Sequence, residues 1–184
     1  MKDFVTTQML PLPSDGALRR TDFDNLPEAP DGWAWELHDG VLELKPMPVS
    51  YWHAEIILML LLHWRARGRK VAAEQRVADS GYVGGGTTRN NRVADGVVFI
   101  DGHVPAADDA THSPDVIDVI IEAVSSTSED RDSVDKLALY AELGIRHYWI
   151  VRQSPGEAID GVVSMYDLVG GRYELVGTTL ASAL

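Results

Sequence analysis

Residues Val116–Val124 form a nearly continuous apolar run, and this run restricts the possible folds more than any other part of the sequence. Many of its side chains are β-branched, which favours a strand over a helix. A strand that lacks a regular alternation of polar and apolar residues is buried on both faces. The run therefore predicts a central strand of a sheet, with other elements packed on both sides of it.

Two amphipathic segments predict the helices of the fold. Ser50 can cap a helix that runs to about Arg67, where Gly68 follows as a stop. Ser126 opens a capping-box pattern, and the helix that follows ends near Gly144. Strands and loops fill the rest of the domain: the hairpin Trp35–Leu37 and Val41–Leu44 with its Asp39-Gly40 turn, the strands Val71–Val77, Arg92–Ile100, His147–Arg152, Val162–Leu168 and Arg172–Val176, and a glycine-rich loop at Gly81–Thr88. This order predicts an α/β fold with a mixed central β-sheet flanked by helices.

The length of 184 residues suggests a single domain. Residues 1–30 are rich in Pro, Asp and Thr, so we expect a lead-in segment there, with one short helix near Asp22–Leu26, and the domain itself over residues 31–184. The best apolar candidate for a membrane span, Ile56–Leu62, is far shorter than the roughly 20 residues that a span needs. No apolar signal core follows Lys2. We therefore expect a cytoplasmic protein without a membrane partner.

The formal net charge of −12 counts against strong, unspecific binding of a polyanion, because nucleic-acid-binding proteins usually carry a basic surface. One local cluster of basic residues does occur: Arg65, Arg67, Arg69 and Lys70. Since cations are also favoured at the C-terminal end of a helix, a solvated helix end explains this cluster better than a binding site does.

Two acidic residues interrupt the apolar strands. Asp95 lies within Val93–Ile100, where a two-residue period places it on one face with Val97 and Phe99. Glu122 lies near the end of the Val116–Val124 run. An unpaired ionised carboxylate in such surroundings costs several kcal/mol, so a basic side chain, a proton or a cation must offset it.

Two readings of these acids are open. If the two strands lie side by side, both carboxylates reach one site, and oxygen donors on a rigid sheet suit Mg²⁺ or Mn²⁺. Alternatively, each acid pairs with a basic side chain or accepts backbone N–H bonds at a strand end. Lys136 is a third candidate, because Asp132, Lys136 and Tyr140 form a polar stripe with a spacing of four residues. On spacing alone, an ordinary ion pair between Asp132 and Lys136 explains that lysine better than a catalytic role does.

Several segments together resemble a known family. Residues Asn91–Val98 (NRVADGVV), Pro114–Val116 (PDV) and Ile121–Val151 (IEAVSSTSEDRDSVDKLALYAELGIRHYWIV) resemble the Uma-two restriction endonucleases, a bacterial branch of the PD-(D/E)xK nuclease superfamily. Trp35–Leu42 (WELHDGVL), the prolines at Pro46 and Pro48, and His53 fit the same family. The resemblance spans residues 30–177.

This resemblance implies a restriction-endonuclease-like core and Mg²⁺- or Mn²⁺-dependent hydrolysis of DNA. The family's strand aspartate and glutamate fall on Asp95 and Glu122, which would bind the ion that activates water. The helix lysine falls on Lys136, which would position that water or stabilise the developing phosphorane charge. Glu36 matches an accessory acid, and His53 matches a histidine near the site. Homodimerisation is implied by analogy with related nucleases, and the exposed edge expected of the C-terminal strands agrees with it.

The missing strand lysine and the acidic net charge of −12 motivate a second hypothesis. Ala94 stands where the motif has proline, and Val124 stands where it has the strand lysine. The chain is therefore either a metal-dependent endonuclease or a non-catalytic nucleic-acid-binding or regulatory module on a nuclease scaffold. A hydrolase of another phosphorylated substrate is a third, weaker alternative. The choice between DNA and RNA stays open at this point.

Overall fold

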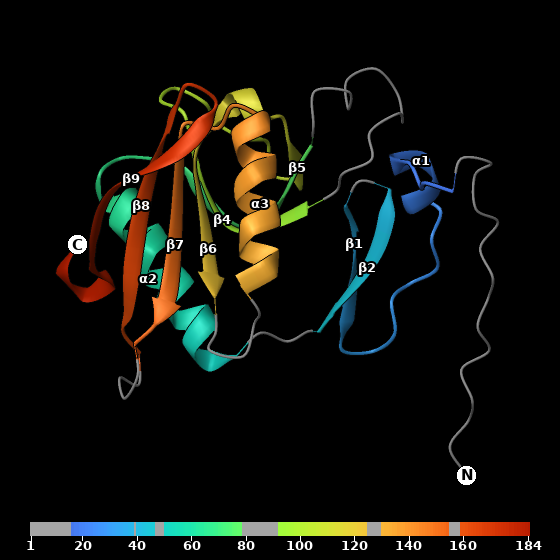
Figure 1. Ribbon diagram of the computed structural model, residues 1–184, viewed down its shortest axis with the longest axis horizontal. Helices are drawn as coiled ribbons and strands as arrows, with labels where there is room; N and C mark the ends of the chain where they lie inside the picture. The colour runs from blue at the N-terminus through green and yellow to red at the C-terminus, as the bar shows by residue number, and fades with distance from the viewer. Residues whose placement is uncertain (1–15, 39, 47–49, 79–91, 125–129, 155–158) are drawn as a thin grey trace, which may run out of the picture.

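The computed structural model describes residues 16–38, 40–46, 50–78, 92–124, 130–154 and 159–184. A seven-stranded mixed sheet forms its centre, with the strand order β5-β3-β4-β6-β7-β8-β9 (Figure 1). The β6–β7 and β3–β5 pairs are parallel, and the other pairs are antiparallel. The strands are β3 (Val71–Val77), β4 (Arg92–Phe99), β5 (Thr111–His112), β6 (Ile117–Val124), β7 (His147–Gln153), β8 (Gly161–Val169) and β9 (Arg172–Leu180). The predicted α/β fold with a mixed central sheet is confirmed.

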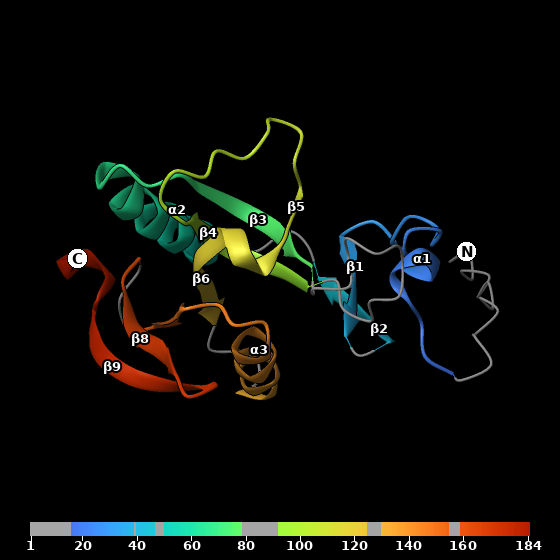
Figure 2. The same ribbon diagram turned by 90° about the horizontal axis from the view of Figure 1, so that it is seen from above.

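Two helices cover opposite faces of this sheet, as Figure 2 shows: α2 (Tyr51–Ala66) and α3 (Asp130–Glu142). The central strand β6 contributes to the apolar core on each side. Its Val119 and Ile121 pack with the apolar side chains of α2, whereas Ile120 packs in the cluster that contains Tyr140 of α3. Burial on both faces explains why this stretch of sequence lacks alternation.

The cap expected for the first long helix is present. The Ser50 hydroxyl accepts a hydrogen bond of 3.2 Å from the backbone N–H of His53, so it fixes the first turn of α2 and with it the position of His53. The second expected cap, Ser126 in the capping-box pattern, lies outside the described residues, as does the glycine-rich loop Gly81–Thr88.

A separate two-stranded sheet, β1 (Trp33–His38) and β2 (Val41–Pro46), lies beside the main sheet (Figure 1). Gly40 closes its turn with a φ of 79°, a conformation that favours glycine. The backbone N–H of Leu18 donates to the Gly40 carbonyl at 2.8 Å, and Leu18 is buried. The described part of the lead-in segment is therefore packed against the hairpin.

The short helix α1 (Arg20–Phe23) begins slightly earlier than the sequence suggested. Its start is fixed by the Asp22 carboxylate, which accepts a 2.9 Å hydrogen bond from the backbone N–H of Arg19. The acid expected to open the helix instead lies in its first turn, where it satisfies a backbone donor.

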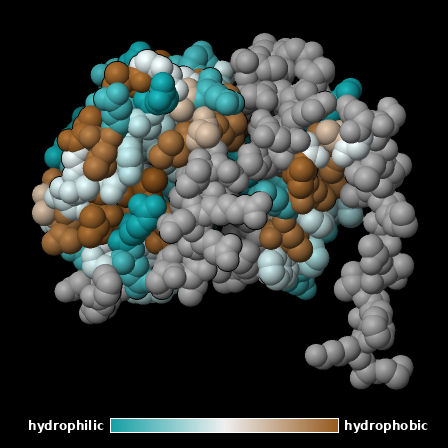
Figure 3. All heavy atoms as spheres, viewed as in Figure 1, coloured by the Kyte–Doolittle hydropathy of each residue, from teal (hydrophilic) through white to brown (hydrophobic). Residues whose placement is uncertain are grey.

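Some of the exposed apolar side chains lie on the hairpin and on the edge strand β9. Trp33, Val41 and Leu44 are exposed on the hairpin, where Figure 3 shows a group of hydrophobic residues. Leu175 and Val176 are exposed on β9, the last strand of the main sheet. Among the described helices, none combines the length and the apolar character that crossing a bilayer requires.

Gly96 of β4 lies close to both α2 and β6. A Cβ atom there would stand 3.2 Å from Leu61 Cδ2 of α2 and 3.3 Å from Ile121 Cβ of β6. Gly96→Ala should therefore lower the free energy of unfolding by about 1–3 kcal/mol, which urea denaturation would measure. Gly177→Ala is the matched control, because its new Cβ would meet only the flexible end of Met165. Equal stability of the two variants would contradict this account of β4.

Candidate active site at the divergence of two strands

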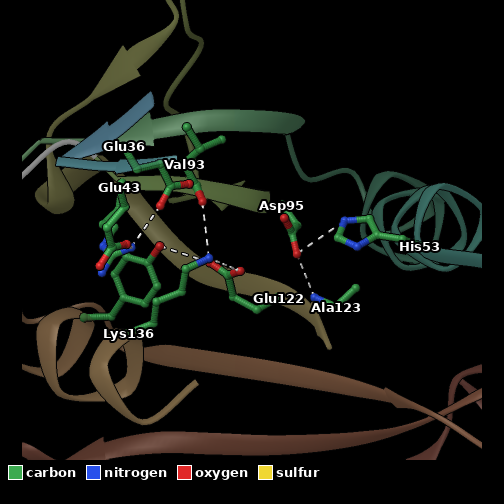
Figure 4. A network of polar contacts seen from close by, with 10 residues as sticks. Glu36, Glu43, His53, Val93, Asp95, Glu122, Ala123 and Lys136 are labelled. Atoms are coloured by element: carbon green, nitrogen blue, oxygen red, sulfur yellow. Dashed lines mark hydrogen bonds and ion pairs between the residues drawn. The ribbon is translucent and has the colours of Figure 1, made fainter. Parts of the chain in front are cut away.

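The pairing of β4 with β6 extends to Gly96 and Ile121, and the next residue on each strand is one of the two acids. Asp95 directly precedes Gly96 in β4, and Glu122 directly follows Ile121 in β6. The two carboxylates thus lie at the point where the strands stop pairing, between the hairpin side and the α2 side of the molecule (Figure 4).

Glu122 is held by two side chains of α3. It is 4% exposed. The ammonium group of Lys136 lies 2.6 Å from its Oε2, and the Tyr140 hydroxyl donates to its Oε1 at 3.0 Å. Lys136 also donates to the backbone carbonyl of Val93 on β4 at 3.5 Å. The lysine therefore connects α3, β6 and β4 at this point (Figure 4).

Asp95 makes its contacts toward α2. Its Oδ2 accepts a 2.8 Å hydrogen bond from the backbone N–H of Ala123 and lies 3.4 Å from His53 Nε2 (Figure 4). The Asp95 carboxylate thus accepts a hydrogen bond from the backbone of β6 just beyond the last paired residues of β4 and β6.

This orientation differs from the two-residue alternation expected from the sequence. Ala94, Val97 and Phe99 all belong to the core cluster of Tyr140, which regular alternation would not allow. Opposite Asp95, Glu74 of β3 has a φ of 53°, an uncommon conformation for a residue with a side chain. The alternation is thus broken near Asp95, which lies beside His53 instead of on the face of Val97 and Phe99.

The electrostatic field at this point favours ionised groups. Burial alone would lower the pKa of Lys136, but the charge of Glu122, followed by Tyr140, Asp95 and Glu36, raises it well above its usual value. Burial would raise the pKa of Asp95, but the hydrogen bond with His53 and the charge of Lys136 lower it. The raised pKa of Lys136 and the lowered pKa of Asp95 each favour the charged form of the group.

His53 gives the site a measurable pH dependence. Burial lowers its pKa, but the hydrogen bond and charge of Asp95 and the charge of Glu122 raise it above the usual 6.5. A folded-state pKa above the unfolded one stabilises the fold below the unfolded pKa, and this contribution is lost as the pH rises through the folded pKa. In urea denaturation with EDTA, the stability advantage of the wild type over His53→Gln should be largest below pH 6.5 and fall to a constant above the raised pKa. An advantage independent of pH would contradict this role of His53.

The hairpin joins the site through a buried arginine that the sequence analysis did not select. Glu36 and Glu43 are directly opposite in the β1–β2 register. Arg92 Nη1 lies 2.9 Å from Glu36 Oε2 and 2.7 Å from Glu43 Oε2. Since Arg92 is the first residue of β4, it ties the hairpin to the strand that carries Asp95. Glu36, a site residue implied by the resemblance, thus contacts Arg92 and contributes to the field at Lys136.

The sequence contains a signal for Tyr140, which belongs to the polar stripe of Lys136, and a second signal for Arg92. Tyr140 lies four positions after Lys136 on one helix, so both reach the same point of the sheet. Arg92 opens a strand whose other residues, apart from Asp95, are apolar, and two glutamates face each other across the hairpin. A buried cation near paired acids is the expected solution for such a pattern.

Among the described residues, no group of three or more histidine and acidic side chains converges on one ion position. The oxygen donors on either side of the strand divergence are the carboxylates of Asp95 and Glu122 and the backbone carbonyl of Val93. Such a donor set fits Mg²⁺ or Mn²⁺, because these ions prefer oxygen and Mg²⁺ usually keeps several water ligands.

The described residues form a mixed α/β fold with a cluster of charged side chains at the end of the β4–β6 pairing. A crystal structure described as a putative nuclease belonging to DUF820, from Anabaena variabilis ATCC 29413, has a TM-score of 0.57 with this chain. That match has 19% sequence identity and covers 89% of this chain and 83% of the other, so it shows the fold alone. The family model Uma2, described as "Putative restriction endonuclease", matches residues 20–183.

The chain therefore belongs to the Uma2 family. The resemblance noted in the sequence is confirmed, and the family together with the fold supports a nuclease, that is, a hydrolase acting on nucleic acids. No curated protein is similar enough to count as a match.

Proposed function

We propose that this protein is a metal-dependent endonuclease that hydrolyses phosphodiester bonds of DNA, with Asp95 and Glu122 as the residues that hold Mg²⁺ or Mn²⁺. The observation that carries the proposal is the position of both acids at the end of the β4–β6 pairing, beside the buried cation Lys136. Family membership supports the nuclease class.

Asp95, Glu122 and Lys136 have different roles in this proposal. Asp95 and Glu122 orient the ion, which when bound would polarise a phosphoryl oxygen and lower the pKa of a water molecule. Lys136, whose pKa is raised, supplies positive charge that would stabilise the negative charge developing on the phosphoryl oxygens. Lys136 comes from α3, whereas Val124 occupies the position of the usual strand lysine, so the helix replaces the strand as the source of this cation.

A specific observation favours the second candidate, a non-catalytic nucleic-acid-binding or regulatory module. Lys136 lies beside Glu122, and His53 lies beside Asp95. These side chains can neutralise the two acids without an ion. The two candidates differ in whether the protein binds Mn²⁺ at millimolar concentration, which isothermal titration measures.

Plasmid cleavage tests the proposed activity. Supercoiled DNA is incubated with the wild type, Asp95→Ala and Glu122→Ala in Mg²⁺ or Mn²⁺, with EDTA as the control and an RNA of similar length in parallel. We expect cleavage of DNA by the wild type only, and only with the ion. Equal activity of the three proteins, or equal activity in EDTA, would reject the proposal, and cleavage of RNA alone would reject DNA as the substrate.

Homodimerisation and a cytoplasmic location stay predictions. The edge strand β9 with its exposed Leu175 and Val176 is the surface that we expect a second copy to cover. Light scattering on the purified protein would measure the oligomeric state directly.

A further inference from the structure

We propose that Tyr140 is a positioning residue for Glu122 and that it fixes this carboxylate for the ion. The inference rests on the proposed function, since it concerns the same site. Tyr140 is completely buried, at 0% exposure, and its hydroxyl donates to Glu122 Oε1 at 3.0 Å. Lys136 occupies the other oxygen, Oε2, at 2.6 Å. The two oxygens of Glu122 are thus held by two residues one helical turn apart on α3.

This arrangement limits how Glu122 can rotate. One partner alone would leave the carboxylate free to turn about the axis of its side chain, whereas contacts at both oxygens fix its plane. A carboxylate oxygen has two lone pairs, so an oxygen that accepts a bond from Tyr140 can still bind an ion. Hydrogen bonds to metal-binding carboxylates orient them in this way, and losing such a partner typically costs about 10- to 100-fold in metal affinity or activity.

The aromatic surroundings hold Tyr140 itself in place. Its ring centroid lies 5.6 Å from that of Tyr148, and the Tyr148 ring stacks on Tyr173 with centroids 5.5 Å apart. The Tyr173 hydroxyl donates to the backbone carbonyl of Ile145 at 2.7 Å. Tyr140 and Tyr173 therefore share one aromatic cluster and each donates one hydrogen bond, but only Tyr140 donates to a residue of the site.

The similar surroundings of Tyr140 and Tyr173 provide a matched pair of variants. Tyr140→Phe and Tyr173→Phe each remove one hydroxyl from the same cluster. We expect isothermal titration of metal-free protein with Mn²⁺ to show an affinity about tenfold or more lower for Tyr140→Phe, with Tyr173→Phe equal to the wild type. In plasmid cleavage at saturating Mn²⁺, Tyr140→Phe should lower kcat more than it raises KM. Equal Mn²⁺ affinity of the wild type and Tyr140→Phe, or an equal loss in both variants, would overturn the inference.

A second measurement uses the unaltered sequence and does not depend on the stability of a variant. The protein is labelled with 3-fluorotyrosine, and the fluorine signals of its six tyrosines are followed during a Mg²⁺ titration. We expect the Tyr140 signal to shift and the Tyr173 signal to stay. An unshifted Tyr140 signal in a protein that binds Mg²⁺ would overturn the inference but leave the proposed function standing. If the wild type binds neither ion, the proposed function fails and this inference fails with it.

Discussion

Glu122→Gln is expected to lower Mg²⁺-dependent plasmid cleavage at least about a hundredfold. The glutamine keeps the size of the side chain and an oxygen that can accept from Lys136 or Tyr140, but it removes the charge that would bind the ion. Stabilisation by a bound ion in such a site amounts to several kcal/mol, and each 1.36 kcal/mol changes a rate about tenfold. Initial cleavage rates under saturating Mg²⁺ would measure the loss.

Asp118→Asn is the matched control for this variant. Asp118 lies on the same strand β6, is 9% exposed, and is also paired with a cation, because Arg69 Nη2 lies 2.5 Å from its Oδ2. It lies near the start of the strand, however, away from the divergence of β4 and β6. We expect Asp118→Asn to affect stability but to retain cleavage when it is folded. A comparable loss of cleavage in both folded variants would contradict a specific role of Glu122.

Lys136→Met should give the largest loss of stability, about 3–5 kcal/mol in metal-free protein. Removing one partner of a buried ion pair leaves the other charge uncompensated, and Lys136 and Glu122 are 5% and 4% exposed. The double variant Glu122→Gln/Lys136→Met should be more stable than Lys136→Met alone, since no buried charge remains at that position. Urea denaturation in EDTA would measure the free energies of unfolding of the wild type, Lys136→Met and the double variant.

The same variant connects stability with ion binding. Because Mn²⁺ can replace the missing positive charge at Glu122, we expect it to stabilise Lys136→Met by about 2.7 kcal/mol at a hundredfold excess over its Kd. The double variant should gain less. A Lys136→Met protein as stable as the wild type in EDTA would contradict the ion pair as the source of this stability.

The sequence predicted most of the fold because its main elements carry strong local signals. The apolar run at Val116–Val124 became the central strand β6, and the Ser50 cap fixed the start of α2. The two-residue strand β5 was missed, because Thr111 and His112 are too few to show a pattern. Arg69, expected on a solvated helix end, is instead held by Asp118 and by the Phe99 carbonyl at 2.7 Å. Such long-range pairing leaves no local signal.

The site was predictable only in part for the same reason. The positions of Asp95 and Glu122 in apolar strands indicated that something must neutralise them, and the described contacts show Lys136 and His53 beside them. Asp95 departs from regular alternation opposite Glu74, whose φ is positive, and periodicity within one strand does not reveal such a departure. The link between the hairpin and β4 depends on Arg92, whose partners are far away in sequence.

The central claim is that Asp95 and Glu122 together hold one divalent ion. A crystal soaked in millimolar Mn²⁺ and measured for anomalous scattering tests it most directly. We predict a single strong peak at the divergence of β4 and β6, with oxygen atoms of both carboxylates at roughly 2.0–2.6 Å from the ion. A peak bound by only one of the two acids, or no peak between them in a protein that cleaves DNA, would contradict it.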